Sequence, residues 1–171
     1  MASPSGKRPL LLILIDQVVG VLDIMHTCAY ASMCISSRAR ETSLTTTGLD
    51  KWYGYMKSHD DTALWDLLHP DAVFESPVVH TPQRGRDITF QYLSSAEKVL
   101  GGPGFRYVGE WRSDHGAVLE FENEIEGIRI NGVDIITFDA DGRITQFKVM
   151  VRPLKAINLL HRLMGEQLAK S

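Results

Sequence analysis

The stretch Gly132-Val133-Asp134-Ile135-Ile136-Thr137-Phe138 has the two-residue alternation of a β-strand. Ile136 and Phe138 share an apolar face, and Asp134 lies in phase with them. A carboxylate that points into an apolar interior is costly unless it is paired or protonated, and such groups often mark functional sites. We therefore expect Asp134 either to line a cavity or to be a structural acid bonded to a neighbouring strand or a tryptophan indole.

Further strands flank this one in the sequence. Residues 105–111 and 117–125 precede it with the same alternation, and the strand itself is expected over about 128–138. The turn residues Asp139-Ala140-Asp141-Gly142 then lead into a fourth strand over 143–152. Consecutive strands joined by short turns predict an antiparallel sheet.

Helical patterns lie on both sides of these strands. Periodicity predicts helices over 48–58, 61–68 and 87–100, a short strand over 72–76, and a last amphipathic helix over 153–169. Helices followed by a run of strands are typical of an α+β fold, and a curled sheet would leave a cavity against the helices. The side chains expected to point inward are mostly aromatic: Trp52, Met56, Trp65, Phe74, Ser76, Tyr92, Phe105, Trp111, Phe121, Asn123, Asp134, Ile136, Phe138 and Phe147.

Three segments carry a resemblance to a known family: Leu67 to Pro77, Gly85-Arg86-Asp87-Ile88, and Gly132 to Ile144. They resemble the nuclear transport factor 2-like (NTF2-like) superfamily, and in particular its SnoaL-like branch, which is related to polyketide cyclases and ketosteroid isomerases. The resemblance covers about residues 47–165. It implies a cone of three N-terminal helices, a curved, mostly antiparallel sheet around a cavity, and a C-terminal helix. It also implies a homodimer formed through the outer face of the sheet.

The ketosteroid isomerase pattern can be carried over at three positions. Its oxyanion-hole aspartic acid, which an apolar site keeps neutral, falls on Asp134. Its general-base aspartate falls on Ser76, which cannot act as that base unaided, and its oxyanion tyrosine falls near Trp52. Because only one of the three roles is kept, a literal steroid isomerase is not expected.

The candidate catalytic residues are Asp134, as acid or oxyanion donor, and His80, as base, because an imidazole titrates near pH ~6.5. The expected ligand is a small apolar, cyclic or aromatic metabolite, and the expected chemistry is cofactor-free isomerisation, cyclisation or dehydration. The alternative is a non-catalytic ligand-binding or dimerisation module. The side chains expected to contact the ligand are Trp52, Tyr55, Phe74, Ser76, Tyr92, Trp111, Phe121 and Asn123.

No metal or cofactor site is expected. The four glutamates at alternate positions from 120 to 126 indicate a solvated sheet face or the rim of a subunit contact. The segment 139–142 lacks the later glutamate of a calcium loop, and the glycine-rich segment 101–104 lacks the lysine of a phosphate-binding loop.

Residues 1–42 are interpreted separately from the domain expected over 43–171. The run of leucines and isoleucines over 10–15 resembles a signal-peptide core, but charged residues soon interrupt it, so a membrane span is not expected. Three interpretations stay open for this segment. It is a non-native extension upstream of a start at Met25, Met33 or later; an element that packs on the domain; or a targeting or anchoring segment.

Charge and cysteine content exclude some partners. A formal net charge of −3 gives no electrostatic reason to expect nucleic acid. The two cysteines, Cys28 and Cys34, both precede the expected domain, so no disulfide framework holds its fold. This usage suits a reducing compartment, and we expect a cytoplasmic protein that binds neither nucleic acid nor membrane.

Overall fold

The computed structural model describes residues 47–170. The predictions for residues 1–42, including those for Cys28 and Cys34, lie outside the described residues. The three interpretations of that segment, and its boundary with the domain, therefore stay predictions.

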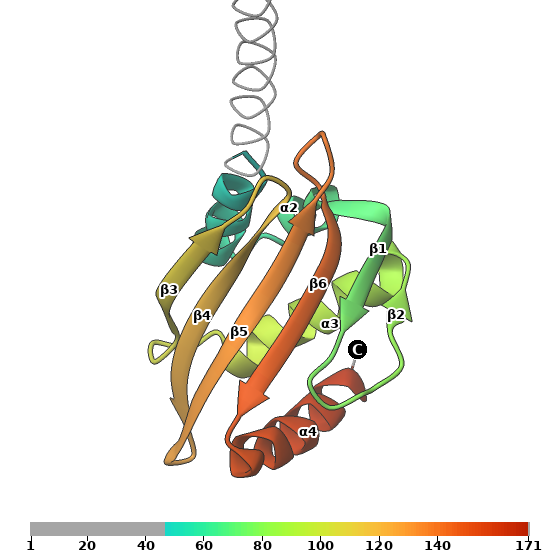
Figure 1. Ribbon diagram of the computed structural model, residues 1–171. Coiled ribbons are helices and arrows are strands. Elements are labelled where there is room, and N and C mark those ends of the chain that lie inside the picture. Colours follow the sequence, from blue (N-terminus) through green and yellow to red (C-terminus); the bar gives the residue numbers. More distant parts are fainter. Residues whose placement is uncertain (1–46, 171) are drawn as a thin grey trace, which may run out of the picture. The chain divides into compact units, whose positions relative to one another are not determined.

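Three helices precede most of the sheet and one follows it, as predicted (Figure 1). The second helix begins after Asp60, whose side chain accepts a hydrogen bond from the backbone N–H of Thr62 at 2.9 Å. The last one begins after Pro153, whose fixed backbone suits a helix start. The helices are helix 47–58, α2 (Asp61–Leu67), α3 (Arg86–Leu100) and α4 (Leu154–Leu168).

The strands form one six-stranded sheet in the order β2-β1-β6-β5-β4-β3, and all neighbours are antiparallel except the parallel pair β1–β6 (Figure 1). This confirms the predicted α+β class and the mostly antiparallel sheet. β1 begins four residues earlier than predicted. β2 was not predicted, because two residues are too few to show an alternation pattern. The strands are β1 (Leu68–Glu75), β2 (Gln83–Arg84), β3 (Arg106–Arg112), β4 (Gly116–Ile125), β5 (Ile128–Phe138) and β6 (Ile144–Arg152).

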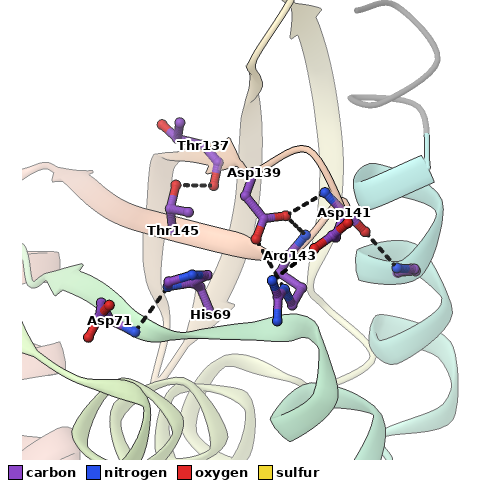
Figure 2. Close-up of polar contacts among 8 residues, drawn as sticks. His69, Asp71, Thr137, Asp139, Asp141, Arg143 and Thr145 are labelled. Carbon is purple, nitrogen blue, oxygen red and sulfur yellow. Dashed lines mark hydrogen bonds and ion pairs between the residues drawn. The ribbon is translucent and has the colours of Figure 1, made fainter. Parts of the chain in front are cut away.

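The predicted turn between β5 and β6 is fixed by its own side chains (Figure 2). Asp139 Oδ1 accepts hydrogen bonds from the backbone N–H groups of Asp141 and Arg143, at 2.9 and 2.8 Å. Arg143 Nε donates to the other oxygen, Asp139 Oδ2, at 3.0 Å. Lys51 Nζ donates to the Asp141 carbonyl oxygen at 3.2 Å. The turn therefore sets the pairing of β5 with β6 and ties it to helix 47–58.

One face of the sheet, called here the inner face, packs against the helices. Leu119, Ile136 and Phe147 on this face are at most 2% exposed and belong to a core shared with helix 47–58, α2 and α3. A second core joins Phe121 to Leu160 of α4. The space between these two cores is where the cavity described below lies.

A β-bulge in β3 places on the outer face one of the residues that were expected to point inward. The pairing of β3 with β4 shifts between Tyr107 and Gly109, which adds one residue to β3 and reverses the facing of the residues that follow. Trp111 consequently pairs with Val118 and is 57% exposed on the outer face. The prediction that Trp111 points inward was wrong, because it assumed unbroken alternation from Phe105 onward.

Trp65 was also expected to point inward, and it does not. It is 36% exposed on α2, with its ring centroid 5.5 Å from that of Phe90 in an edge-to-face contact. The guanidinium carbon of Arg86 lies 5.3 Å from the Trp65 ring centroid. The helical period placed Trp65 near the core, but α3 meets it at the edge of the core.

Gly132 is required by close packing in β5. A Cβ at this position would meet the Phe121 ring and would lie 2.6 Å from the Met150 carbonyl oxygen. Because overpacking of this kind forces shifts in a packed sheet, we expect Gly132→Ala to lower the free energy of unfolding by about 2 kcal/mol. Urea denaturation measures this.

The matched control for Gly132→Ala is Gly54→Ala in helix 47–58, where an added Cβ would meet nothing within 4 Å apart from the local backbone of the helix and the adjacent residues. Alanine favours the helix, so this control is expected to raise stability by up to about 1 kcal/mol. Equal effects of the two substitutions would contradict the packing argument.

None of the helices formed by residues 47–170 is long and apolar enough to cross a membrane.

Candidate functional site

A mainly apolar cavity of about 230 Å³ lies between the inner face of the sheet, helix 47–58, α3 and α4. The volume exceeds the roughly 150 Å³ that holds benzene and falls below the ~300–1,000 Å³ of drug-sized sites, so it suits a small ring molecule. The structure brings together here most of the residues predicted from the sequence: Trp52, Tyr55, Phe74, Ser76, Tyr92, Phe121 and Asp134.

Asp134 is the buried acid of this cavity. It lies in β5 between Leu119 of β4 and Val149 of β6, and it is 6% exposed. Tyr107 Oη donates a hydrogen bond to Asp134 Oδ2 at 2.8 Å, and Trp52 Nε1 donates to Tyr107 Oη at 3.1 Å. Asp134 is therefore both a cavity residue and the end of a hydrogen-bonded chain, with a tyrosine between it and the indole.

Burial raises the pKa of Asp134 to about 7, and the hydrogen bond from Tyr107 opposes that rise. Near neutral pH the carboxyl is thus partly protonated, and it then has an O–H to donate into the cavity. Burial, together with the charge of Asp134, holds the pKa of Tyr107 well above its usual range. Tyr107 therefore stays a neutral donor.

Removing the Tyr107 hydroxyl is expected to lower the free energy of unfolding and to raise the pKa of Asp134. In Tyr107→Phe the carboxyl and the indole N–H of Trp52 both lose a buried partner, so we expect a loss of about 2 kcal/mol in urea denaturation at pH 6. The pKa of Asp134 should rise above 7, because the lost bond favours the ionised form. A carboxyl titration followed by NMR measures the second effect.

The control is Tyr53→Phe. The hydroxyl of Tyr53 donates to Glu110 outside the cavity and partly in solvent. This substitution is expected to leave the titration of Asp134 unchanged. If Tyr107→Phe has the same free energy of unfolding and the same Asp134 pKa as the wild type, the hydrogen bond from Tyr107 neither stabilises the fold nor changes the pKa of Asp134.

Ser76 lines the cavity but cannot serve as a base. Its Oγ accepts hydrogen bonds from the backbone N–H groups of Val78 and Val79, at 3.2 and 3.4 Å. These bonds make a local turn of the kind that serine hydroxyls form. Ser76 thereby shapes the loop at the cavity wall, with its lone pairs already engaged.

Three predicted site residues do not line the cavity. His80 is exposed in the loop before β2, and Trp111 lies on the outer face. Asn123 is buried, but its Nδ2 donates to the Leu100 carbonyl oxygen at 2.8 Å, so it fixes the end of α3. The structure does not bring these three side chains to the cavity, because alternation and loop position in the sequence do not show where a cavity ends.

Some polar residues in the cavity wall were not among the predicted site residues. Tyr107 is one of them, although it alternates with Phe105 in the sequence. Glu97 of α3 and His161 of α4 line the cavity as well. Glu97 follows the buried Leu93 by one helical turn, and this spacing was the signal that could have found it.

Among residues 47–170, no group of three or more His, Cys, Asp or Glu side chains is placed to hold a metal ion. The alternating glutamates of β4 are instead engaged with neighbouring strands. Glu122 forms an ion pair with Arg106 at 2.7 Å, and Glu120 accepts from Asn131 at 2.9 Å.

Comparison with known proteins agrees with this geometry. Residues 49–147 match the model of the SnoaL-like domain. No curated protein matches the chain. A steroid delta-isomerase from Pseudomonas aeruginosa is 36% identical, with a TM-score of 0.70 over 74% of this chain and 93% of that one.

Two further solved structures share the fold. A bacterial protein with a cystatin-like fold from Silicibacter pomeroyi is 26% identical, with a TM-score of 0.64 over 70% of this chain and 84% of that one. An NTF2-like protein from Mesorhizobium loti is 21% identical, with a TM-score of 0.56 over 65% of this chain and 93% of that one. The chain therefore belongs to the SnoaL-like domain family and has the NTF2-like fold.

Proposed function

We propose that the cavity binds a small apolar ring molecule by its carbonyl group, with protonated Asp134 donating a hydrogen bond to the carbonyl oxygen. One observation carries this proposal: the acid is buried in an apolar cavity, where burial raises its pKa to about 7. A carbonyl oxygen accepts the proton that this carboxyl then presents. Tyr107 continues to donate to the other carboxyl oxygen.

Proton transfer next to that carbonyl is the chemistry that such a site supports. A donor aimed at a carbonyl oxygen stabilises the negative charge that develops there when a base removes a proton from the adjacent carbon. We assign this base to His161, whose side chain lines the cavity. The 36% identity to a protein described as a steroid delta-isomerase supports an isomerisation of this type. A ligand as long as a steroid would extend out of a cavity of about 230 Å³.

Non-catalytic binding is the second candidate. It is favoured by Ser76, whose hydroxyl is engaged by two backbone N–H groups at the position where the resemblance places a base. In this case the cavity holds the ring molecule and no carbon loses a proton.

The two candidates are separated with one probe, the bicyclic ketone trans-2-decalone. Binding is measured by calorimetry at pH 6, and exchange of the hydrogens beside the carbonyl for deuterium is followed by NMR in D2O. The result expected for proton transfer is binding with accelerated exchange in the wild type, and binding with much slower exchange in Asp134→Asn. Binding without exchange assigns a non-catalytic module, and no binding would contradict both.

We also propose that the protein forms a homodimer through the outer face of the sheet. This face exposes Trp111 by 57%, Met150 by 55% and Val108 by 46%, and apolar area of this kind is often covered by a partner. Light scattering on Trp111→Lys is expected to show a monomer where the wild type is a dimer. The control Leu154→Lys changes a residue of α4 that is 71% exposed, and it should stay a dimer.

A further inference from the structure

A second polar position lies in the cavity wall beyond Asp134. Tyr55 follows Trp52 by three residues in helix 47–58, so it lies about 4.5 Å further along the helix axis and on a neighbouring part of the same side. Both side chains line the cavity, and their ring centroids are 5.4 Å apart. Trp52 belongs to the hydrogen-bonded chain that ends at Asp134, whereas the Tyr55 hydroxyl is a separate polar group in the cavity wall.

The Tyr55 hydroxyl is available to a ligand. The residue is 2% exposed, and its hydroxyl makes no hydrogen bond within the described part of the chain. Because Tyr55 lines a mainly apolar cavity, few protein groups there compete for its hydroxyl proton. A ligand atom that accepts a hydrogen bond from Tyr55 would therefore gain a contact that the protein itself does not make.

Glu97 supplies an acceptor near that hydroxyl. Its Oε1 lies 2.8 Å from His59 Nδ1, and its Oε2 has no hydrogen-bond donor among residues 47–170. The carboxylate is held against the cavity wall, since a Cβ at Gly101 would lie 2.5 Å from Glu97 Oε1. The backbone N–H of His59 donates to the Tyr55 carbonyl oxygen at 2.8 Å, so the residue that Glu97 contacts lies one helical turn after Tyr55. Burial, together with the charges of Glu97 and Asp61, raises the pKa of Tyr55, so Tyr55 stays a donor.

A donor and an acceptor side by side fit one ligand group in particular. A hydroxyl both accepts and donates, so it can take the proton of Tyr55 and give its own to Glu97. A carbonyl or ether oxygen would leave Glu97 without a donor, and an ammonium group would leave Tyr55 without an acceptor. We infer that the ligand carries a hydroxyl group at the end remote from its carbonyl, and that Tyr55 and Glu97 bind it.

This inference rests on the proposed function and names its substrate class: apolar ring molecules with a carbonyl at one end and a hydroxyl at the other. Asp134 binds the first group, and Tyr55 with Glu97 binds the second. The apolar walls between them, which include Phe74 and Phe147, contact the ring.

The test compares two probes that differ by one hydroxyl, trans-2-decalone and 6-hydroxy-trans-2-decalone, by calorimetry at pH 6. The wild type is expected to bind the hydroxyl compound at least about tenfold more tightly, because a hydrogen bond to a charged group is worth about 1.5–3 kcal/mol. In Tyr55→Phe and in Glu97→Gln this ratio should fall to within about threefold of unity. Tyr53→Phe removes a hydroxyl from the same helix outside the cavity and should keep the wild-type ratio.

The outcomes separate this inference from the proposed function. If both probes bind the wild type equally, or if the ratio persists in Tyr55→Phe, the hydroxyl site is overturned while the cavity remains a ketone site. If neither probe binds, the proposed function fails and the inference fails with it. Circular dichroism of Tyr55→Phe checks the fold, which should be intact because the lost hydroxyl has no partner among the described residues.

Discussion

Replacing Asp134 by asparagine is expected to stabilise the domain above pH 7 and to remove much of the pH dependence of its stability between pH 4 and 7. Burial raises the pKa of this carboxyl from its ordinary value of 3.8 to about 7. Between these two values the folded protein holds a proton that the unfolded chain has released. The free energy of unfolding therefore falls as the pH rises through this range, and it levels off above pH 7.

The size of this effect follows from the same pKa. A change from 3.8 to about 7 corresponds to about 4 kcal/mol between acid and alkaline conditions, at about 1.36 kcal/mol for each pKa unit. An asparagine has no such proton to lose, and its carbonyl oxygen can still accept from Tyr107. Asp134→Asn should thus equal or exceed the wild type in stability at pH 9.

Urea denaturation of both proteins from pH 4 to pH 9 measures this difference. Groups with a lowered pKa, such as Glu75 and Asp139, add stability as the pH rises, but they are common to both proteins and cancel in the comparison. Asp66→Asn, at an exposed position of α2, is the control, and its curve should run parallel to that of the wild type. If the curve of Asp134→Asn also runs parallel to that of the wild type, burial does not raise the pKa of Asp134.

The affinity for trans-2-decalone is expected to fall about a hundredfold from pH 5 to pH 9. Only protonated Asp134 donates to the carbonyl oxygen of the ligand, and the ionised form would oppose it with a second negative oxygen. With a pKa of about 7, the protonated fraction is nearly complete at pH 5 and is about one hundredth at pH 9. The affinity should therefore be constant below pH 6 and lose a factor of ten for each pH unit above 7.

Calorimetric titrations at five pH values provide this measurement. Asp134→Asn is the control, because its amide N–H can donate at every pH and its affinity should not change between pH 5 and pH 9. A wild-type affinity that is equally flat would mean that Asp134 does not bind the carbonyl, even if the cavity holds the ligand.

Much of the fold could be predicted because β4 and β5 alternate without interruption near the core, and β6 does so from Gln146 onward. The turn at Asp139 was also predictable, since a short side-chain oxygen such as that of Asp commonly accepts hydrogen bonds from backbone N–H groups a few residues further on. The bulge in β3 could not be predicted, because an inserted residue leaves no local mark in the sequence. It moved Trp111 from the inner to the outer face.

The candidate site was predictable only in part. The phase of Asp134 in its strand was visible in the sequence, and burial with a raised pKa is its physical consequence. The partner Tyr107 was not identified, because a tyrosine that alternates with apolar residues has the same pattern whether or not its hydroxyl is bonded. Whether the interior is packed or hollow depends on side-chain volumes and rotamers, so the sequence does not reveal that His80 and Asn123 lie away from the cavity or that Glu97 lines it.

The protonation state of Asp134 is the centre of this account, and an NMR titration of its side-chain carboxyl carbon tests it most directly. The signal is assigned by its absence from Asp134→Asn, and it is followed from pH 3 to pH 9 with and without trans-2-decalone. We expect a pKa of about 7 in the free protein, rising further when the ligand is bound. A pKa near 4 in both states would contradict the account, because the acid would then be ionised at neutral pH and could not donate a proton to a ligand.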